Sequence, residues 1–227
     1  NMAEALVLFG LGLLLLALGG DSIVKGASGL AQKFGASPFI AGLLLVAFGT
    51  SIPELFVNAR AYAVGAQDLA LGNAVGSNIV NFGLTLGLAA LAAPLLIRMR
   101  LLSPMLVALV VATLAVILFG LDGVISQLEG IVLLLAFVAM LVFMLVRSGR
   151  ESLEVRESVA AYADTRSVLW LNLLRFAIAV ALLYFGAKFV VSSAPILGAS
   201  WGLSPLLVGL LPIAIGTALP EVAAAFP

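Results

Sequence analysis

The segment Gly49-Thr50-Ser51-Ile52-Pro53-Glu54 lies in the middle of an apolar stretch, residues 37–64, that is long enough to cross a lipid bilayer. Pro53 has no backbone N–H and disrupts the preceding helical turn, which leaves carbonyl groups without donors where lipid offers none. Glu54 adds a carboxylate whose burial in a bilayer is unfavourable unless it is compensated. A bound cation would satisfy both groups, whereas a simple helix kink would explain only the glycine and the proline.

The composition indicates a membrane protein with an oxygen-based chemistry. Of the 227 residues, 63% are hydrophobic and 10% are charged, whereas soluble domains have about 25% charged residues. The net charge is zero, so no basic surface points to nucleic acid as a partner. The chain has no cysteine and no histidine, so a metal site must use oxygen ligands, which favours Na⁺, Ca²⁺ or Mg²⁺.

Apolar stretches bounded by charged or turn residues predict an all-α protein with seven membrane spans. The predicted spans are residues 4–33, 37–64, 69–93, 103–120, 127–146, 168–191 and 204–227. Most lysines and arginines fall in cytoplasmic loops if the N-terminus lies outside, and we therefore predict that orientation. The predicted organisation is a first half at residues 1–150, a charged cytoplasmic linker at 151–167 and the start of a second half at 168–227.

An internal repeat relates the two halves. Ser37-Pro38 recurs as Ser204-Pro205, and the glutamate motif recurs as Gly216-Thr217-Ala218-Leu219-Pro220-Glu221, 167 residues later (221 − 54). Five predicted spans separate the starts of the two copies, and because five is odd the second copy is inverted. Inverted repeats are typical of secondary transporters. Two glutamates at equivalent inverted positions favour a functional role over a kink.

A second motif, residues 72–81, reads Gly-Asn-Ala-Val-Gly-Ser-Asn-Ile-Val-Asn. Gly72 and Gly76 form a small-residue face suited to close helix packing. Ser77 and Asn81 lie one helical turn apart and could present oxygens to the same site. The alternative is that the polar residues only make hydrogen bonds between helices, and Asn73 and Asn78 fit that interpretation as well.

The two motifs together resemble the α-repeats of the sodium/calcium exchanger family, in the cation/calcium exchanger superfamily and of prokaryotic type, over residues 26–90 and 192–221. The resemblance implies ten helices in two inverted sets of five, about seven of which are present, with alternating access to a central site. By motif position it implies that the metal is bound by the paired carboxylates of Glu54 and Glu221, by oxygens of Thr50, Ser51, Thr217, Ser77 and Asn81, and by the backbone carbonyls of Ala47 and Ala214.

Two departures from the family pattern affect these expectations. Ala218 stands where the pattern has the counterpart of Ser51, so the second half loses one hydroxyl ligand. The second repeat is also C-terminally incomplete at Pro227, and about 90 further residues would complete an inverted repeat. We expect the missing helices to come from the same chain or from another chain.

The predicted function is a secondary antiporter that exchanges Ca²⁺ for Na⁺ and is not an enzyme. Ca²⁺ and Na⁺ are expected at the site as transported ions, without a resident cofactor, and the bilayer is the expected surroundings. The predicted location is the inner or plasma membrane, as a multi-pass protein. A Ca²⁺/H⁺ or other cation antiporter on the same fold, a passive cation channel, and a non-transporting fragment or scaffold are the alternatives.

Overall fold

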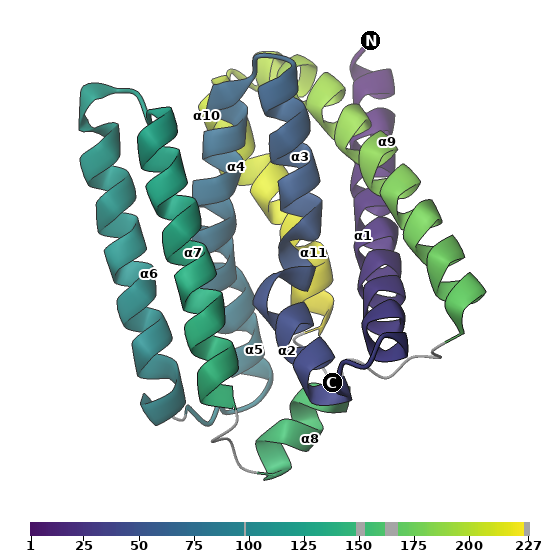
Figure 1. Cartoon of the computed structure of the whole chain (residues 1–227). Helices are drawn as coiled ribbons and strands as arrows, with labels where there is room; N and C mark the ends of the chain where they lie inside the picture. The colour runs from purple at the N-terminus through teal and green to yellow at the C-terminus, as the bar shows by residue number, and fades with distance from the viewer. Residues whose placement is uncertain (98, 149–152, 162–167, 225–227) are drawn as a thin grey trace. The chain divides into compact units, whose positions relative to one another are not determined.

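The computed structural model describes residues 1–97, 99–148, 153–161 and 168–224, and these residues are nearly all helical (Figure 1). Within them, six helices are long and apolar enough to cross a membrane. The predicted second span is not among the six because it is divided into α2 (Pro38–Phe48), the 3₁₀ turn η1 (Gly49–Ser51) and α3 (Ile52–Ala63). The glutamate motif therefore breaks its helix at the position where Pro53 removes a backbone donor.

The remaining predicted spans correspond to single helices or to helices that contain a π turn. The first and sixth are α1 (Met2–Lys33) and α9 (Leu169–Trp201), and the fourth and fifth are α6 (Met99–Phe119) and α7 (Gln127–Ser148), with the 3₁₀ turn η3 (Gly120–Asp122) between them. The third contains α4 (Gln67–Val80), the π turn η2 (Asn81–Thr85) and α5 (Leu86–Ala92), and the last contains α10 (Pro205–Val208), the π turn η4 (Gly209–Ile213) and α11 (Ala214–Ala224).

Helix α9 continues past residue 191, where the sequence analysis ended the sixth span. Pro195 lies inside the helix. The hydroxyls of Ser192 and Ser193 donate back to the Phe189 carbonyl, at 3.1 and 2.6 Å. Ser193, Ala194 and Leu197 are buried, so tertiary packing holds the helix together across the proline.

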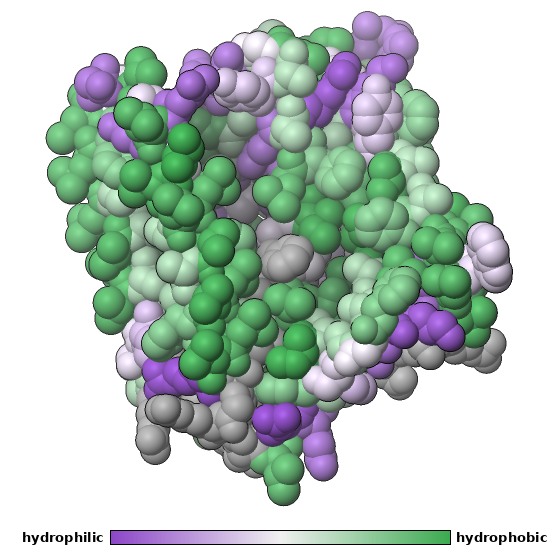
Figure 2. Space-filling view, in the orientation of Figure 1, coloured by the Kyte–Doolittle hydropathy of each residue, from purple (hydrophilic) through white to green (hydrophobic). Residues whose placement is uncertain are grey.

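The chain forms two compact units. One comprises residues 1–94 and 157–227, and the other comprises residues 95–156, which include α6 and α7. Most large apolar side chains of α6 and α7 are exposed, as expected for helices that face lipid. Of the predicted linker at 151–167, only residues 153–161 are among those described, and they form α8 (Leu153–Ala161). Figure 2 shows that hydrophobic side chains cover most of the visible face of the protein.

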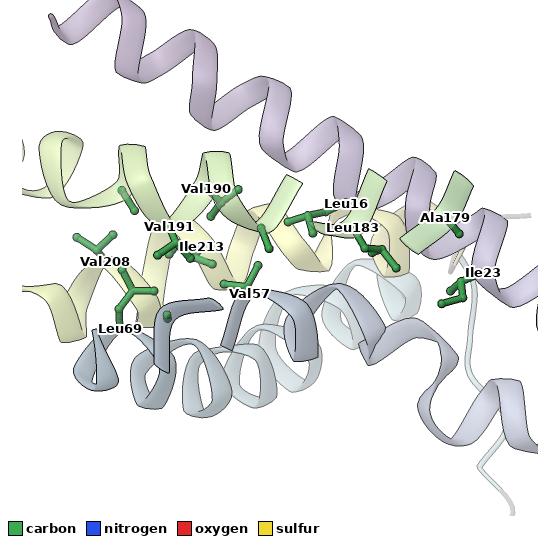
Figure 3. Close-up of a cluster of buried hydrophobic side chains, with 13 residues drawn as sticks. Leu16, Ile23, Val57, Leu69, Ala179, Leu183, Val190, Val191, Val208 and Ile213 are labelled. Carbon is green, nitrogen blue, oxygen red and sulfur yellow. The ribbon is translucent and has the colours of Figure 1, made fainter. Parts of the chain in front are cut away.

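The core of the first unit lies where α1 and α9 pack against each other, against α3 and against the last segment, while α4 packs against α3 and the last segment. Leu16, Leu183, Val57, Val190 and Ile213 are almost completely buried in it (Figure 3). Glycines allow the close approach of α1 and α9. A Cβ atom added to Gly12 would lie 2.9 Å from the Gly186 carbonyl oxygen, so no side chain fits at this crossing.

Helix α4 packs equally closely against the start of the last segment, as the small-residue pattern predicted. A Cβ atom added to Gly72 would meet the Leu206 carbonyl, and one added to Gly76 would lie 2.7 Å from the Cα atom of Leu210. Both obstacles are backbone atoms, which cannot rotate away. The packing therefore fixes α4 relative to η4, directly before the second glutamate motif.

The two copies of the repeat have the same helix cap but differ in backbone structure at the glutamate motif. Ser37 caps α2 by accepting from the Ile40 N–H at 3.2 Å, and Ser204 caps α10 by accepting from the Leu207 N–H at 3.3 Å. The first motif is broken by η1, whereas α11 runs through the second motif without a break and has a π turn before it. Isolated π turns occur frequently at functional sites.

We predict that Gly76→Ala destabilises the protein by about 1–3 kcal/mol, because its methyl group meets backbone that cannot move aside. Gly87→Ala is the matched control in the same membrane segment, since a Cβ atom there has nothing within 4 Å. Thermal unfolding of the purified protein in detergent measures both effects. Equal unfolding temperatures for the two variants would contradict the close packing of α4 against η4.

Candidate cation site

Glu54 occupies the first turn of α3, directly after the helix break. The residue is 6% exposed, and neither carboxylate oxygen has a hydrogen-bond partner among the described residues. The N-terminal end of a helix carries a partial positive charge, which favours a carboxylate there. This effect alone is modest, so an uncompensated buried carboxylate still requires a proton or a cation.

The helix break places hydroxyl groups beside Glu54. Ser51 precedes α3 at the N-cap position, but its side chain makes no capping hydrogen bond. Its hydroxyl is exposed and lines the cavity described below. Helix α1 accommodates the break, since a Cβ atom on Gly20 would lie 3.1 Å from Pro53 Cγ. A glycine in α1 thus makes room for the proline that creates the break.

A cavity of about 200 Å³ opens next to Glu54. This volume corresponds to roughly six water molecules in the liquid, enough for a cation with part of its hydration shell. Both motifs of the first half contribute to its wall. The lining residues are Ser51, Glu54, Leu55, Asn58, Ala74, Ser77, Asn78 and Asn81.

The second glutamate motif brings a second carboxylate to the same place. The Glu54 carboxylate interacts with the charge of Glu221 and with the Thr217 hydroxyl, and Glu221 interacts with the side chains of Thr50 and Asn81. One oxygen of Glu221, Oε2, is buried and has no hydrogen-bond partner in the described part of the chain. Two like charges held together out of water repel each other, and a divalent cation between them would remove that repulsion.

Thr217 is 2% exposed, and its hydroxyl lies within hydrogen-bond distance of the carbonyls of Ile213 and Ala214 in its own helix, at 3.0 and 3.3 Å. A hydroxyl has one proton and two lone pairs. The proton can go to a carbonyl of α11 or to the Glu54 carboxylate. When it goes to a carbonyl, the lone pairs are available to a neighbouring cation.

Hydroxyl and amide oxygens would have to complete the coordination shell. Among the described residues, no group of three or more His, Cys, Asp or Glu side chains could hold a metal ion. Asp21 is exposed on α1 and pairs with Lys25 at 2.8 Å, so it is not part of such a group. Seven or so oxygens suit Ca²⁺, and two carboxylates with hydroxyl, amide and backbone oxygens can supply such a set.

Four of the predicted ligands, Ser51, Glu54, Ser77 and Asn81, line the cavity. Glu221 supplies the second carboxylate. Thr217 interacts with the Glu54 carboxylate, and Thr50 interacts with that of Glu221. Ala47 lies in the last turn of α2, and its role as a ligand stays a prediction. Ala214 is 0% exposed, and its carbonyl accepts from Thr217.

Asn58 and Asn73 contribute more to the site than the sequence analysis predicted. Asn58 lines the cavity one turn after Glu54, a spacing that could have identified it. Asn73 is completely buried and donates a hydrogen bond to Asn58 at 2.8 Å. The predicted alternative role of Asn73, a hydrogen bond between helices, is therefore confirmed.

Known proteins match both halves of this chain. The family described as sodium/calcium exchanger protein matches residues 4–146 and 171–226. The inner membrane protein YrbG of Escherichia coli (strain K12) is 36% identical over 234 residues, which cover 99% of this chain and 70% of YrbG. The sodium/calcium exchanger MaX1 of Methanosarcina acetivorans is 52% identical over 85 residues, which cover 37% of this chain and 24% of MaX1.

A solved structure of the sodium-calcium exchanger NCX_Mj, soaked with 2.5 mM Na⁺ and 10 mM Sr²⁺, matches with a TM-score of 0.58 and 31% identity. The match covers 99% of this chain and 73% of that chain. Both glutamate motifs lie within the residues that match the family. The chain therefore belongs to the sodium/calcium exchanger family and is a multi-pass membrane protein with the transporter fold of NCX_Mj.

Proposed function

We propose that this protein is an antiporter that exchanges Ca²⁺ for Na⁺ across the membrane by alternating access. The observation that carries the proposal is the buried carboxylate of Glu54, whose two oxygens have no hydrogen-bond partner among the described residues and which faces the charge of Glu221. A site of this kind binds a cation or a proton, since lipid and protein provide no other way to neutralise it.

The ligand chemistry favours Ca²⁺ and Na⁺ as the ions. Both are hard cations that take oxygen ligands, and the wall of the cavity offers carboxylate, hydroxyl and amide oxygens. Two carboxylates balance one Ca²⁺ or two Na⁺. Competition between these occupancies for the same two charges supplies a physical basis for exchange, because binding of one ion requires release of the other.

Coupling to Na⁺ is preferred over coupling to H⁺ because the segment Ala74-Val75-Gly76-Ser77-Asn78 brings a hydroxyl and an amide to the site but no further carboxylate. MaX1 and NCX_Mj are sodium/calcium exchangers by name, which supports the same choice. In this proposal the ions are cargo, the protein needs no resident cofactor, and it catalyses no covalent reaction.

The proposed setting is the inner or plasma membrane, as the name of YrbG suggests. We place the N-terminus outside on the basis of the distribution of lysine and arginine. The match with this chain covers 70% of YrbG and 73% of the NCX_Mj chain. Transport is therefore to be tested on the intact protein that carries this sequence.

The first test concerns ion binding at Glu54. We expect Ca²⁺ to stabilise the native protein, by about 2.7 kcal/mol at one hundred times its dissociation constant, and Glu54→Gln to abolish that stabilisation. Without Ca²⁺ the variant should be at least as stable as the native protein, because the repulsion between the two carboxylates is gone. Thermal unfolding with Ca²⁺ or with a chelator measures both effects.

Glu4→Gln is the control for this test, since Glu4 is an exposed carboxylate in the first turn of α1. We expect the Ca²⁺-dependent stabilisation to remain in that variant. If Ca²⁺ stabilises Glu54→Gln as strongly as the native protein, the cation is bound elsewhere.

The second test concerns transport. In liposomes that contain the intact protein, an outward Na⁺ gradient should drive Ca²⁺ uptake above its equilibrium level. Glu221→Gln should slow this uptake at least about tenfold, which corresponds to about 1.4 kcal/mol of lost ion stabilisation. Uptake driven only by a proton gradient would replace Na⁺ by H⁺ as the coupled ion. Flux that never exceeds equilibrium would indicate a channel, and no flux at all would support a scaffold.

A further inference from the structure

Asn73 is completely buried in α4 and does not itself line the cavity. A buried amide is unfavourable unless its donors and its acceptor find partners. Its Nδ2 donates to Asn58 Oδ1 at 2.8 Å, and its Oδ1 accepts from the Ser77 hydroxyl at 3.4 Å. One buried side chain thus connects two residues that do line the cavity, Asn58 on α3 and Ser77 on α4.

The bond to Asn58 determines the direction of the Asn73 oxygen. A carboxamide group is planar, so fixing its N–H direction also fixes the direction of its carbonyl oxygen. The 2.8 Å bond is the shorter of the two and therefore the stronger. It holds the amide plane so that Oδ1 faces Ser77, which lies one helical turn further along α4.

The direction of the Ser77 proton decides what this residue can bind. A serine hydroxyl has one proton and two lone pairs. When the proton is directed to Asn73, only lone pairs are left for the cavity, and lone pairs are what a cation requires. Without this contact the hydroxyl could rotate and direct its proton at the cation, which would oppose binding.

We propose that Asn73 is a positioning residue that turns the Ser77 hydroxyl so that its lone pairs face a cation bound beside Glu54. Asn58 is the anchor of this arrangement and accepts the bond that holds the amide plane. The inference rests on the proposed function, because it requires a cation at this site. Asn73 acts on the ion through Ser77 and does not touch it.

Thr113 on α6 provides a control outside the site, since it is exposed and is not one of the lining residues. Its hydroxyl donates to the Leu109 carbonyl of its own helix at 2.8 Å. Thr113→Val removes this hydrogen bond and should leave Ca²⁺ affinity within about twofold of the native value, as for most exposed positions.

The experiment is a double-mutant cycle on Ca²⁺ affinity, measured by titration calorimetry on the purified intact protein. Asn73→Leu and Ser77→Ala should each weaken Ca²⁺ binding by about three- to tenfold, the range for one hydrogen bond or oriented ligand. The double variant should be no weaker than the weaker single variant, because both changes remove the same interaction. If the two fold-losses of Ca²⁺ affinity instead multiply in the double variant, Asn73 supports only the fold, and the proposal is overturned.

Asn73→Asp is the conservative variant, since one carboxylate oxygen still accepts from Ser77 and the Asn58 amide can turn over to donate to the other oxygen. In this background Ser77→Ala should weaken binding as much as it does in the native protein, and an unchanged affinity there would overturn the proposal. This comparison decides the question if Asn73→Leu does not fold. A native protein that binds neither Ca²⁺ nor Na⁺ would overturn the proposed function itself, whereas a native protein that binds while the cycle is additive would overturn only the role of Asn73.

Discussion

The carboxylate of Glu54 is buried in a membrane-spanning segment, and none of the described residues donates a hydrogen bond to either of its oxygens. A charge in this position is unfavourable unless an ion or a proton accompanies it. Most local features around it serve to place oxygens nearby. The break at η1 exposes the Ser51 hydroxyl, and Gly20 on α1 leaves space for the proline that causes the break.

Close backbone packing keeps the two carboxylates together. Glu54 and Glu221 lie on segments far apart in the sequence, and each segment packs against α4. Gly72 and Gly76 allow the backbone of α4 to approach Leu206 and Leu210 directly. Because backbone cannot rotate away as a side chain can, this packing fixes the distance between α4 and the second motif and so limits how far the carboxylates can separate.

Much of the fold could be predicted from hydropathy, and the central residues of the site from the repeated motif. Glu54 and Glu221 could be identified because burying a carboxylate in an apolar segment is unfavourable. An acidic residue inside such a segment can be recognised from the sequence alone. The end of α9 was placed too early, because the burial of Ser193 and Leu197 that carries the helix past Pro195 depends on tertiary contacts. The link from Asn73 to Asn58 joins two helices, and sequence spacing within one helix contains no information about it.

The inverted repeat does not make the site symmetrical. Ser51 lines the cavity, whereas its counterpart Ala218 is 0% exposed and packs with Val80 and Ala214. Ala218 has no side-chain oxygen and is not among the residues that line the cavity. The same motif position therefore supplies a hydroxyl to the cavity wall in the first copy and a packing contact in the second copy. Sequence similarity between two repeats thus does not make each pair of corresponding residues equivalent as ligands.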